Sequence, residues 1–253
     1  MASPRTRLDL LLVSRGLAES RTRAEALVLA GRVKVKGVER PKPGTPLGAD
    51  AEVPVEGPAH PGVSRGGVKL AAGLEAFRID PAGRTWRDVG ASTGGFTDVL
   101  LSRGAARVYA IDGGHGQLHA RLRSDPRVVL REGVNARLLS RAEVPEPCSL
   151  LVADVSFISL RLILPAAVPL LAPLAEALLL VKPQFESERG EVGRGGIVRD
   201  EGVRERAAAR VVAAAEGLGL AHLGTVPSPI TGADGNVELL AAFQLGGWPT
   251  PSS

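Results

Sequence analysis

A glycine-rich turn is the first feature of this sequence that could perform chemistry. The stretch "DVGASTGGFTDVLL" places Gly90, Gly94 and Gly95 between a predicted strand and a helix that starts near Phe96. Small residues let a ligand approach the backbone closely, and the free N–H groups of a helix N-terminus bind anions or carboxylates. The stretch therefore predicts a cofactor site.

An acid follows this turn at a useful distance. Asp112 closes the next predicted strand, eighteen positions after Gly94, where a carboxylate can bind ribose hydroxyls. The combination fits both nicotinamide cofactors and S-adenosylmethionine. The turn is not G-x-G-x-x-G, and S-adenosylmethionine, which has no phosphate, makes fewer demands on glycine spacing. Together with the rest of the sequence, this favours the methyl donor.

Two further charged residues follow apolar strands. Asp154 ends "LLVAD" and Lys182 ends "LLLVK". Each has a structural alternative, since Asp154 could cap a turn and Lys182 could be a surface cation at a strand end. Together they predict an acid and an amine at neighbouring strand ends beside the cofactor site.

Strand-like and helical segments alternate from Trp86 onward, which predicts a mainly parallel sheet with helices on both faces. Ligands in such α/β folds bind beyond the carboxyl ends of the strands, where the three charged residues lie. The predicted strands are 85–90, 107–112, 127–132, 149–154, 177–183, 220–226 and 237–244, and the predicted helices start near Phe96 and Leu118 or span 160–171 and 201–218.

The first sixty residues have a different pattern. "RLDLLLVSRG" and "SRTRAEALVLAG" predict two helices, "RVKVKG" predicts a strand, and basic residues cluster on the polar side. This arrangement resembles the S4 RNA-binding domain. The alternative is a basic helical hairpin with a solvated charged face. Clustered cations on rigid helices suit phosphate binding, which favours RNA.

Bulk composition excludes several classes of protein. A single cysteine rules out an internal disulfide, and the four histidines lack zinc-ligand spacing, so we expect no metal. The apolar stretch 162–181 is broken by prolines and Glu176, which argues against a membrane span, and the N-terminus makes a poor signal peptide. We expect a cytoplasmic protein with no stable protein partner.

Several uncommon strings point to one family. "VSRGGVKL", "GASTGGFTDVLL", "ADVSFISL", "LVKPQFE" and "VGRGGIVRD" occur in the order and spacing of the TlyA family of ribosomal RNA methyltransferases, and the chain resembles that family over nearly its whole length. The resemblance implies an α/β, Rossmann-like S-adenosylmethionine-dependent methyltransferase domain of the FtsJ-like type, preceded by a small α+β S4 domain. Together with the Pro- and Gly-rich stretches near residues 40–62 and at the end of the chain, this predicts the domains 1–60, a linker 61–66, 67–246 and a disordered tail 247–253.

The resemblance also implies a reaction: methyl transfer from S-adenosylmethionine to the 2′-hydroxyl of cytidine in ribosomal RNA. "MASPRTRLD" resembles members with a longer N-terminus, which implies action on both 16S and 23S rRNA. The implied catalytic tetrad is Lys69, Asp154, Lys182 and Glu238. The implied cofactor contacts are Gly90, Ala91, Ser92, Thr93, Gly94, Gly95, Phe96, Asp112 and Asn135, and the RNA contacts are Arg7, Arg21, Arg23, Arg32, Lys34, Lys36 and Arg65.

The tetrad also makes chemical sense from the residue types. A ribose hydroxyl is a poor nucleophile at neutral pH, and a lysine amine can accept its proton when burial or a second cation favours the neutral form, whereas arginine stays protonated. Lys182 could instead be an orienting donor. Two other functions stay open: a membrane-active protein, since relatives are called haemolysins, and an RNA-binding protein with an inactive second domain.

Overall fold

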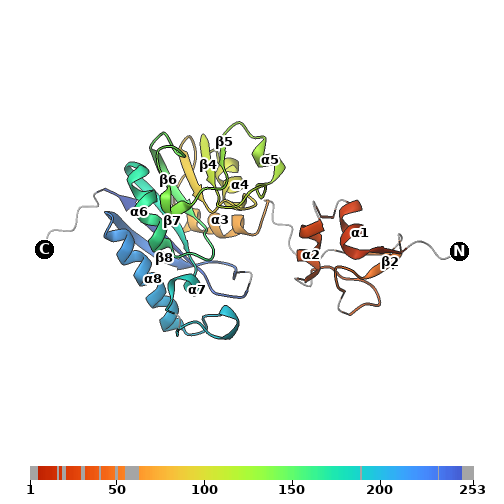
Figure 1. The fold of residues 1–253 in the computed structure, drawn as a ribbon. Coiled ribbons are helices and arrows are strands. Elements are labelled where there is room, and N and C mark those ends of the chain that lie inside the picture. Colours follow the sequence, from red (N-terminus) through yellow and green to blue (C-terminus); the bar gives the residue numbers. More distant parts are fainter. Residues whose placement is uncertain are drawn as a thin grey trace. The chain divides into compact units, whose positions relative to one another are not determined.

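The computed structural model describes residues 5–15, 17–18, 21–29, 32–39, 41–48, 51–54, 63–188, 190–232 and 234–246, without the side chains of Thr22, Arg23, Ala26 and Arg194. The chain divides into two compact units, Met1–Ala59 and His60–Ser253, each with its own hydrophobic core (Figure 1). The predicted tail 247–253 and the start of the predicted linker, 61–62, lie outside the described residues.

The first unit combines two helices with a two-stranded antiparallel sheet. Apolar residues at helical spacing turn inward, so that Leu8, Leu12 and Val28 are almost fully buried. Both predicted helices are confirmed. The predicted strand at 32–37 is not formed, because the chain turns back at Gly37 (φ +80°) and leaves only isolated bridges, such as Val35 with Val38. The elements are β1 (Arg5–Arg7), α1 (Leu8–Ser14), α2 (Arg21–Leu29) and β2 (Pro46–Gly48).

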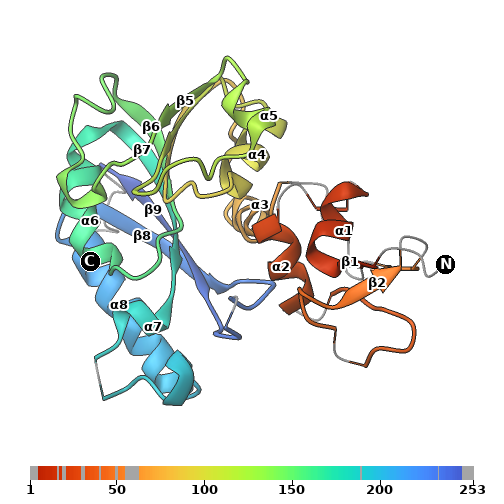
Figure 2. The same ribbon diagram turned by 45° about the vertical axis from the view of Figure 1, so that its right-hand side comes forward.

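The second unit is built on a seven-stranded sheet of order β5-β4-β3-β6-β7-β9-β8 (Figure 2). The first five strands in chain order run parallel, and β9 runs antiparallel to both of its neighbours. This confirms the α/β architecture predicted from the alternation. The strands are β3 (Thr85–Val89), β4 (Arg107–Ile111), β5 (Val128–Arg131), β6 (Cys148–Ala153), β7 (Leu171–Val181), β8 (Leu220–Pro227) and β9 (Leu239–Leu245).

Helices cover both faces of this sheet. Leu74 and Leu100 belong to the core between the sheet and α3 and α4, whereas Ile163 and Val211 belong to the core under α6 and α8. The helix α3 was not predicted. The helices are α3 (Gly66–Ala76), α4 (Gly95–Ser102), α5 (Ala120–Arg123), α6 (Leu160–Ala167), α7 (Pro183–Glu186) and α8 (Glu201–Glu216), with 3-10 turns at Ala136–Leu138, Val168–Leu170 and Arg194–Gly196.

The strand order reverses at β3. This strand lies between β4 and β6, so the chain leaves it in one direction for β4 and β5 and returns on its other side for β6 and β7. Ligands of open α/β sheets bind at such a switch point, beyond the carboxyl ends of the strands. The topology therefore points to the edge that carries Asp112, Asp154 and Lys182.

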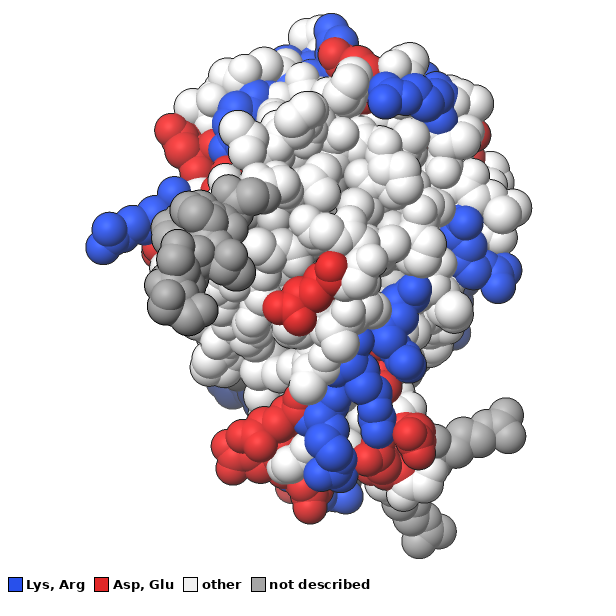
Figure 3. All heavy atoms as spheres, turned by 90° about the vertical axis from the view of Figure 1, so that its left-hand side faces the viewer, with Lys and Arg blue, Asp and Glu red and all other residues white. Residues whose placement is uncertain are grey.

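Charged side chains are spread unevenly over one face of the second unit (Figure 3). Much of the face in Figure 3 carries neither acidic nor basic side chains, whereas both kinds are interleaved at its lower end. The segment between α7 and α8 lies at the same lower end in Figure 1. Glu191 of this segment binds both Arg206 and Arg210 of α8, so acidic and basic side chains alternate there.

Candidate active site

The glycine-rich turn connects β3 to α4, as predicted. Gly90 has φ +86°, and a Cβ there would lie 2.3 Å from the carbonyl oxygen of Asp154, so only glycine lets the end of β6 pass so close. At Gly94 and Gly95 a Cβ would instead meet Leu122 at 2.2 Å and the Ser64 hydroxyl at 2.1 Å. These two glycines therefore serve chain packing in this structure.

Asp154 and Lys182 form an ion pair across neighbouring strand ends. Asp154 directly follows β6 and Lys182 directly follows β7, and the two strands are parallel neighbours. The Lys182 Nζ lies 2.6 Å from Asp154 Oδ1, outside hydrogen-bond geometry, and donates a hydrogen bond of 2.8 Å to Ser156 Oγ. The amine is thus held by one charge and one hydroxyl, with little of its side chain exposed.

Lys69 and Glu238 form a second, more deeply buried ion pair. Lys69 is 8% exposed on α3, and Glu238 is 2% exposed directly before β9. Because β9 runs antiparallel to β7, the residue that precedes it lies at the same sheet edge as the residue that follows β7, and Val181 pairs with Leu239. A Cβ at Gly66, in the first turn of α3, would lie 3.8 Å from Asp154 Oδ2, so α3 starts beside the first pair.

A cavity of about 1100 Å³ opens at the carboxyl ends of β3, β4 and β6. Of the predicted cofactor residues, Gly90, Ser92, Asp112 and Asn135 line it, and Asp154 lines it too. The lining does not include the other five, which are Ala91, Thr93, Gly94, Gly95 and Phe96.

Asp112 is fixed by the backbone around it. Its Oδ2 accepts from Ser92 N at 2.8 Å and its Oδ1 accepts from Gly114 N at 2.7 Å. Each oxygen keeps a second lone pair for a ligand. Asn135 caps the 3-10 turn that follows β5 by accepting from Arg137 N at 3.1 Å.

The cavity is also lined by two phenylalanines that were not among the predicted site residues. Phe157 is 92% exposed and has φ +64°, and its ring centroid lies 5.3 Å from that of Phe185. A bulky residue in the left-handed region costs about 1–3 kcal/mol and is found at functional sites. Their place in the sequence could have indicated them, because Phe157 comes shortly after Asp154 and Phe185 shortly after Lys182. Aromatic residues are also few in this chain.

Asp88, near the end of β3, is a buried acid beneath this site. Burial raises its pKa to about 7, while a hydrogen bond of 2.7 Å from the Thr97 hydroxyl opposes the shift. Asp154 and Asp112 add to the increase through charge repulsion. The folded state therefore holds a proton that the unfolded chain, with a pKa of 3.8, loses at lower pH.

This difference predicts a pH-dependent stability. Between about pH 4 and pH 7 the Asp88 contribution should fall as pH rises, by up to ~1.4 kcal/mol per pH unit. Asp88→Asn should remove that decline, so the difference in unfolding free energy between variant and wild type should grow toward pH 7. Urea titrations from pH 4.5 to 7 measure it. Parallel curves for the two proteins would contradict the assignment.

Two of the predicted RNA contacts in the first unit, Arg7 and Arg21, are held by one buried acid. Asp9 is fully buried and binds Arg7 at 2.7 Å and Arg21 at 3.0 Å, which lowers its pKa well below the usual range. Lys34 and Lys36 are exposed, and Arg32 is half-buried. The Arg23 side chain lies outside the described residues, and Arg65 is exposed at the start of α3 in the second unit.

Comparison with known families gives this arrangement a name. The model of the family described as FtsJ-like methyltransferase matches residues 62–245, which is well over half of the chain. The chain belongs to the FtsJ-like methyltransferase family. In addition, the S4 domain model matches residues 6–53 of this methyltransferase.

Individual relatives match over most of their length. A Mycobacterium tuberculosis protein named 16S/23S rRNA (cytidine-2′-O)-methyltransferase TlyA is 48% identical, over 92% of this chain and 88% of the relative. Hemolysin A of Brachyspira hyodysenteriae is 41% identical, over 94% of this chain and 99% of the relative. A solved structure named as a hemolysin from Streptococcus thermophilus is 40% identical with a TM-score of 0.77, covering 98% of this chain and 91% of that one.

The residues of the cavity fit S-adenosylmethionine, the donor implied by the resemblance to methyltransferases. The carboxylate of Asp112 suits ribose hydroxyls, and the amides of Gln117 and Asn135 can donate and accept hydrogen bonds. Ile111 and Val134 provide an apolar wall for a ring of the ligand.

In the part of the chain that the structure describes, no helix is long and apolar enough to cross a membrane, and no three His, Cys, Asp or Glu residues gather as metal ligands.

Proposed function

We propose that this methyltransferase transfers a methyl group from S-adenosylmethionine to the 2′-hydroxyl of a cytidine in ribosomal RNA, in both 16S and 23S rRNA. The observation that carries the proposal is the pair of lysine–carboxylate contacts, Lys182–Asp154 and Lys69–Glu238, at the sheet edge where the cavity opens. The name of the Mycobacterium tuberculosis relative supports the choice of RNA, nucleoside and atom.

The two pairs can perform what a ribose hydroxyl requires. S-adenosylmethionine supplies an electrophilic methyl group on a sulfonium leaving group. The Lys182 amine is proposed to hold or accept the hydroxyl proton, and Asp154 and Ser156 fix its position. Lys69 adds a second cation beside the reacting oxygen, and Glu238 fixes Lys69. The reaction then depends mainly on alignment of the attacking oxygen.

The proposed donor contacts are the turn Gly90–Phe96, Asp112 and Asn135. The backbone of the turn and the two lining side chains would hold the donor beside Asp154. Gly94, Gly95 and Phe96 would act indirectly, by shaping the turn through their packing.

Phe157 suits a nucleotide that is presented out of its helix. Its ring is exposed at the cavity and its backbone is held in the left-handed region. Aromatic rings stack on unpaired bases with a gain of about 1–3 kcal/mol per base. A platform beside the reacting amine would hold the base while the ribose reaches Lys182.

The first unit is proposed to anchor the ribosomal RNA. Of its candidate contacts, Arg7 and Arg21 are held by Asp9, and Lys34 and Lys36 are exposed. We propose residues 1–60 as this anchor and 67–246 as the catalytic domain. An enzyme with this substrate would work in the cytoplasm, with the ribosomal subunits.

The proposal predicts methyl transfer to ribosomal RNA in vitro. Purified protein with tritiated S-adenosylmethionine should label 16S and 23S rRNA in ribosomal subunits, and Lys182→Ala should abolish the label while leaving the melting temperature close to that of wild type. Mapping of 2′-O-methyl positions by nucleotide-resolution sequencing should place the label on ribose. Labelling of a base, or of neither RNA, would contradict the proposal.

The name of the Brachyspira relative motivates a control for membrane activity. The same preparation should cause no leakage from dye-filled liposomes at the concentration that methylates RNA. Leakage without methylation would favour a membrane-active protein. Absence of both, with no donor binding by calorimetry in the presence of RNA, would favour an inactive RNA-binding protein.

A further inference from the structure

Two chain segments contact each other at three successive points, and the cavity is lined by the first of them and by Phe185 of the second. The segment 154–159 follows β6, and the segment 182–186 follows β7. Lys182 contacts Asp154 and Ser156, and next along the chain Phe185 packs on Phe157. The third contact involves Glu186, which was not among the predicted site residues.

Glu186 is a buried carboxylate bound to the start of α6. It is 1% exposed, and its oxygens accept hydrogen bonds from Leu160 N at 2.6 Å, Ser159 Oγ at 2.5 Å and Arg161 Nε at 3.4 Å. Burial raises the pKa of Glu186, while the N–H groups and the positive end of the helix dipole at the start of α6 oppose that shift. This contact fixes the end of segment 154–159.

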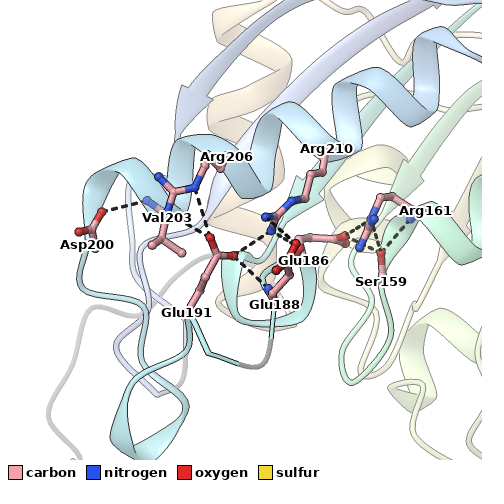
Figure 4. A network of polar contacts seen from close by, with 9 residues as sticks. All are labelled: Ser159, Arg161, Glu186, Glu188, Glu191, Asp200, Val203, Arg206 and Arg210. Carbon is pink, nitrogen blue, oxygen red and sulfur yellow. Dashed lines mark hydrogen bonds and ion pairs between the residues drawn. The ribbon is translucent and has the colours of Figure 1, made fainter.

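The other side of the same residue is fixed to α8. The Arg210 guanidinium donates to the Glu186 carbonyl oxygen at 3.3 Å and also binds Glu188 at 3.2 Å and Glu191 at 2.9 Å (Figure 4). Figure 4 shows Glu186 between Arg210 on one side and Ser159 and Arg161 on the other. Glu186 therefore joins α6 to α8.

Lys182 is one helical turn away from this anchor. Helix α7 is a single turn, in which Phe185 N donates to Lys182 O at 2.9 Å and Ser187 N donates to Pro183 O at 2.9 Å. So short a turn has no independent stability, because isolated helical turns are marginal in water. Lys182 is attached to β7 on one side, and contacts such as those of Glu186 fix the turn on its other side.

We propose that Glu186 is a positioning residue for the reaction: by binding the start of α6 it holds the Lys182 amine and the Asp154–Ser159 wall in register. This inference rests on the proposed function for its effect on rate. Its effect on Lys182 is independent of that function and can be measured separately.

The kinetic test compares Glu186→Gln with Glu188→Gln. Both replace a carboxyl group by an amide, at positions two residues apart, but the Glu188 side chain is 79% exposed. Glu186→Gln should lower kcat for ribosomal RNA methylation by at least about tenfold, because small misplacements of reacting groups are costly. The KM for S-adenosylmethionine should change by less than about threefold. Glu188→Gln should match wild type in both. An unchanged kcat in Glu186→Gln overturns the proposal.

A spectroscopic test needs no activity. The chain has five lysines, so protein labelled with 13C at lysine Cε gives few signals, and Lys182→Arg identifies the Lys182 signal. Glu186→Gln should shift or broaden that signal and leave the Lys69 signal in place, whereas Glu188→Gln should change neither. An unmoved Lys182 signal overturns the proposal. A moved signal in a protein that methylates no RNA supports the positioning role and rejects the proposed reaction.

If Glu186→Gln folds poorly, Ser159→Ala provides a second route. It removes one of the three donors to the Glu186 carboxylate and leaves the charge in place. The same shift of the Lys182 signal, at smaller amplitude, is expected. A folded Ser159→Ala protein with the wild-type Lys182 signal and wild-type kcat would also overturn the proposal.

Discussion

Lys182→Arg should lower kcat for ribosomal RNA methylation by about 100-fold or more, which is the size of a lost proton-transfer contribution. Arginine keeps the positive charge next to Asp154, but it has a planar fork in place of a compact amine and does not release its proton at neutral pH. The contact with Ser156 Oγ at 2.8 Å depends on the reach of the amine. Tritium incorporation into ribosomal subunits measures the effect.

The same exchange elsewhere gives the control. Lys42 is exposed in the first unit and is not among the predicted contacts, so Lys42→Arg should leave the rate unchanged. A pH profile of kcat separates the two roles of Lys182, because a base gives a rate that rises with pH to a plateau and an orienting donor does not. Wild-type activity in Lys182→Arg would reject the catalytic assignment.

Glu238→Gln should destabilise the second unit by about 3–5 kcal/mol, because it leaves the Lys69 ammonium buried without its partner. Lys69→Met should have a similar cost. The double variant Lys69→Met/Glu238→Gln removes both charges and should regain most of the stability. Urea unfolding of the four proteins measures the coupling between the two residues.

Activity should not return with stability. The double variant should remain inactive on ribosomal RNA, because the second cation at the proposed site is lost. The exposed pair Arg103–Glu75 is the control, since Glu75→Gln should cost less than about 1 kcal/mol and leave activity unchanged. Recovery of activity in the double variant would show that the pair is structural.

The sheet could be predicted from the sequence because most of its strands are short apolar runs, and three of these runs are followed by a charged residue. Asp112, Asp154 and Lys182 all follow strands directly, so their common edge followed from the alternation alone. The strand predicted at 32–37 in the first unit did not form, because the chain turns at Gly37 although the β-branched residues before it favour a strand. Short segments are decided by such turns more than by propensity.

Other features depend on contacts that a pattern cannot specify. Helix α3 carries three glycines within "GGVKLAAGLEA", which lowers its helical propensity, and a Cβ at Gly73 would lie 2.8 Å from a methyl carbon of Leu178. Arg87 is fully buried in β3, where its guanidinium donates to the carbonyl oxygens of Ala167, the last residue of α6, and of Leu170. Glu186 was missed for the same reason, since its partners are distant in sequence.

The position of β9 has a consequence for the maturation of this enzyme. It is the last of the seven strands in chain order, yet it lies inside the sheet between β7 and β8, and Glu238 arrives with it. The glycine-rich turn, Asp112, Asp154 and Lys182 are all synthesised earlier. A nascent chain could therefore form the donor site before it could neutralise Lys69, so the proposed catalytic arrangement is complete only when the last strand has inserted.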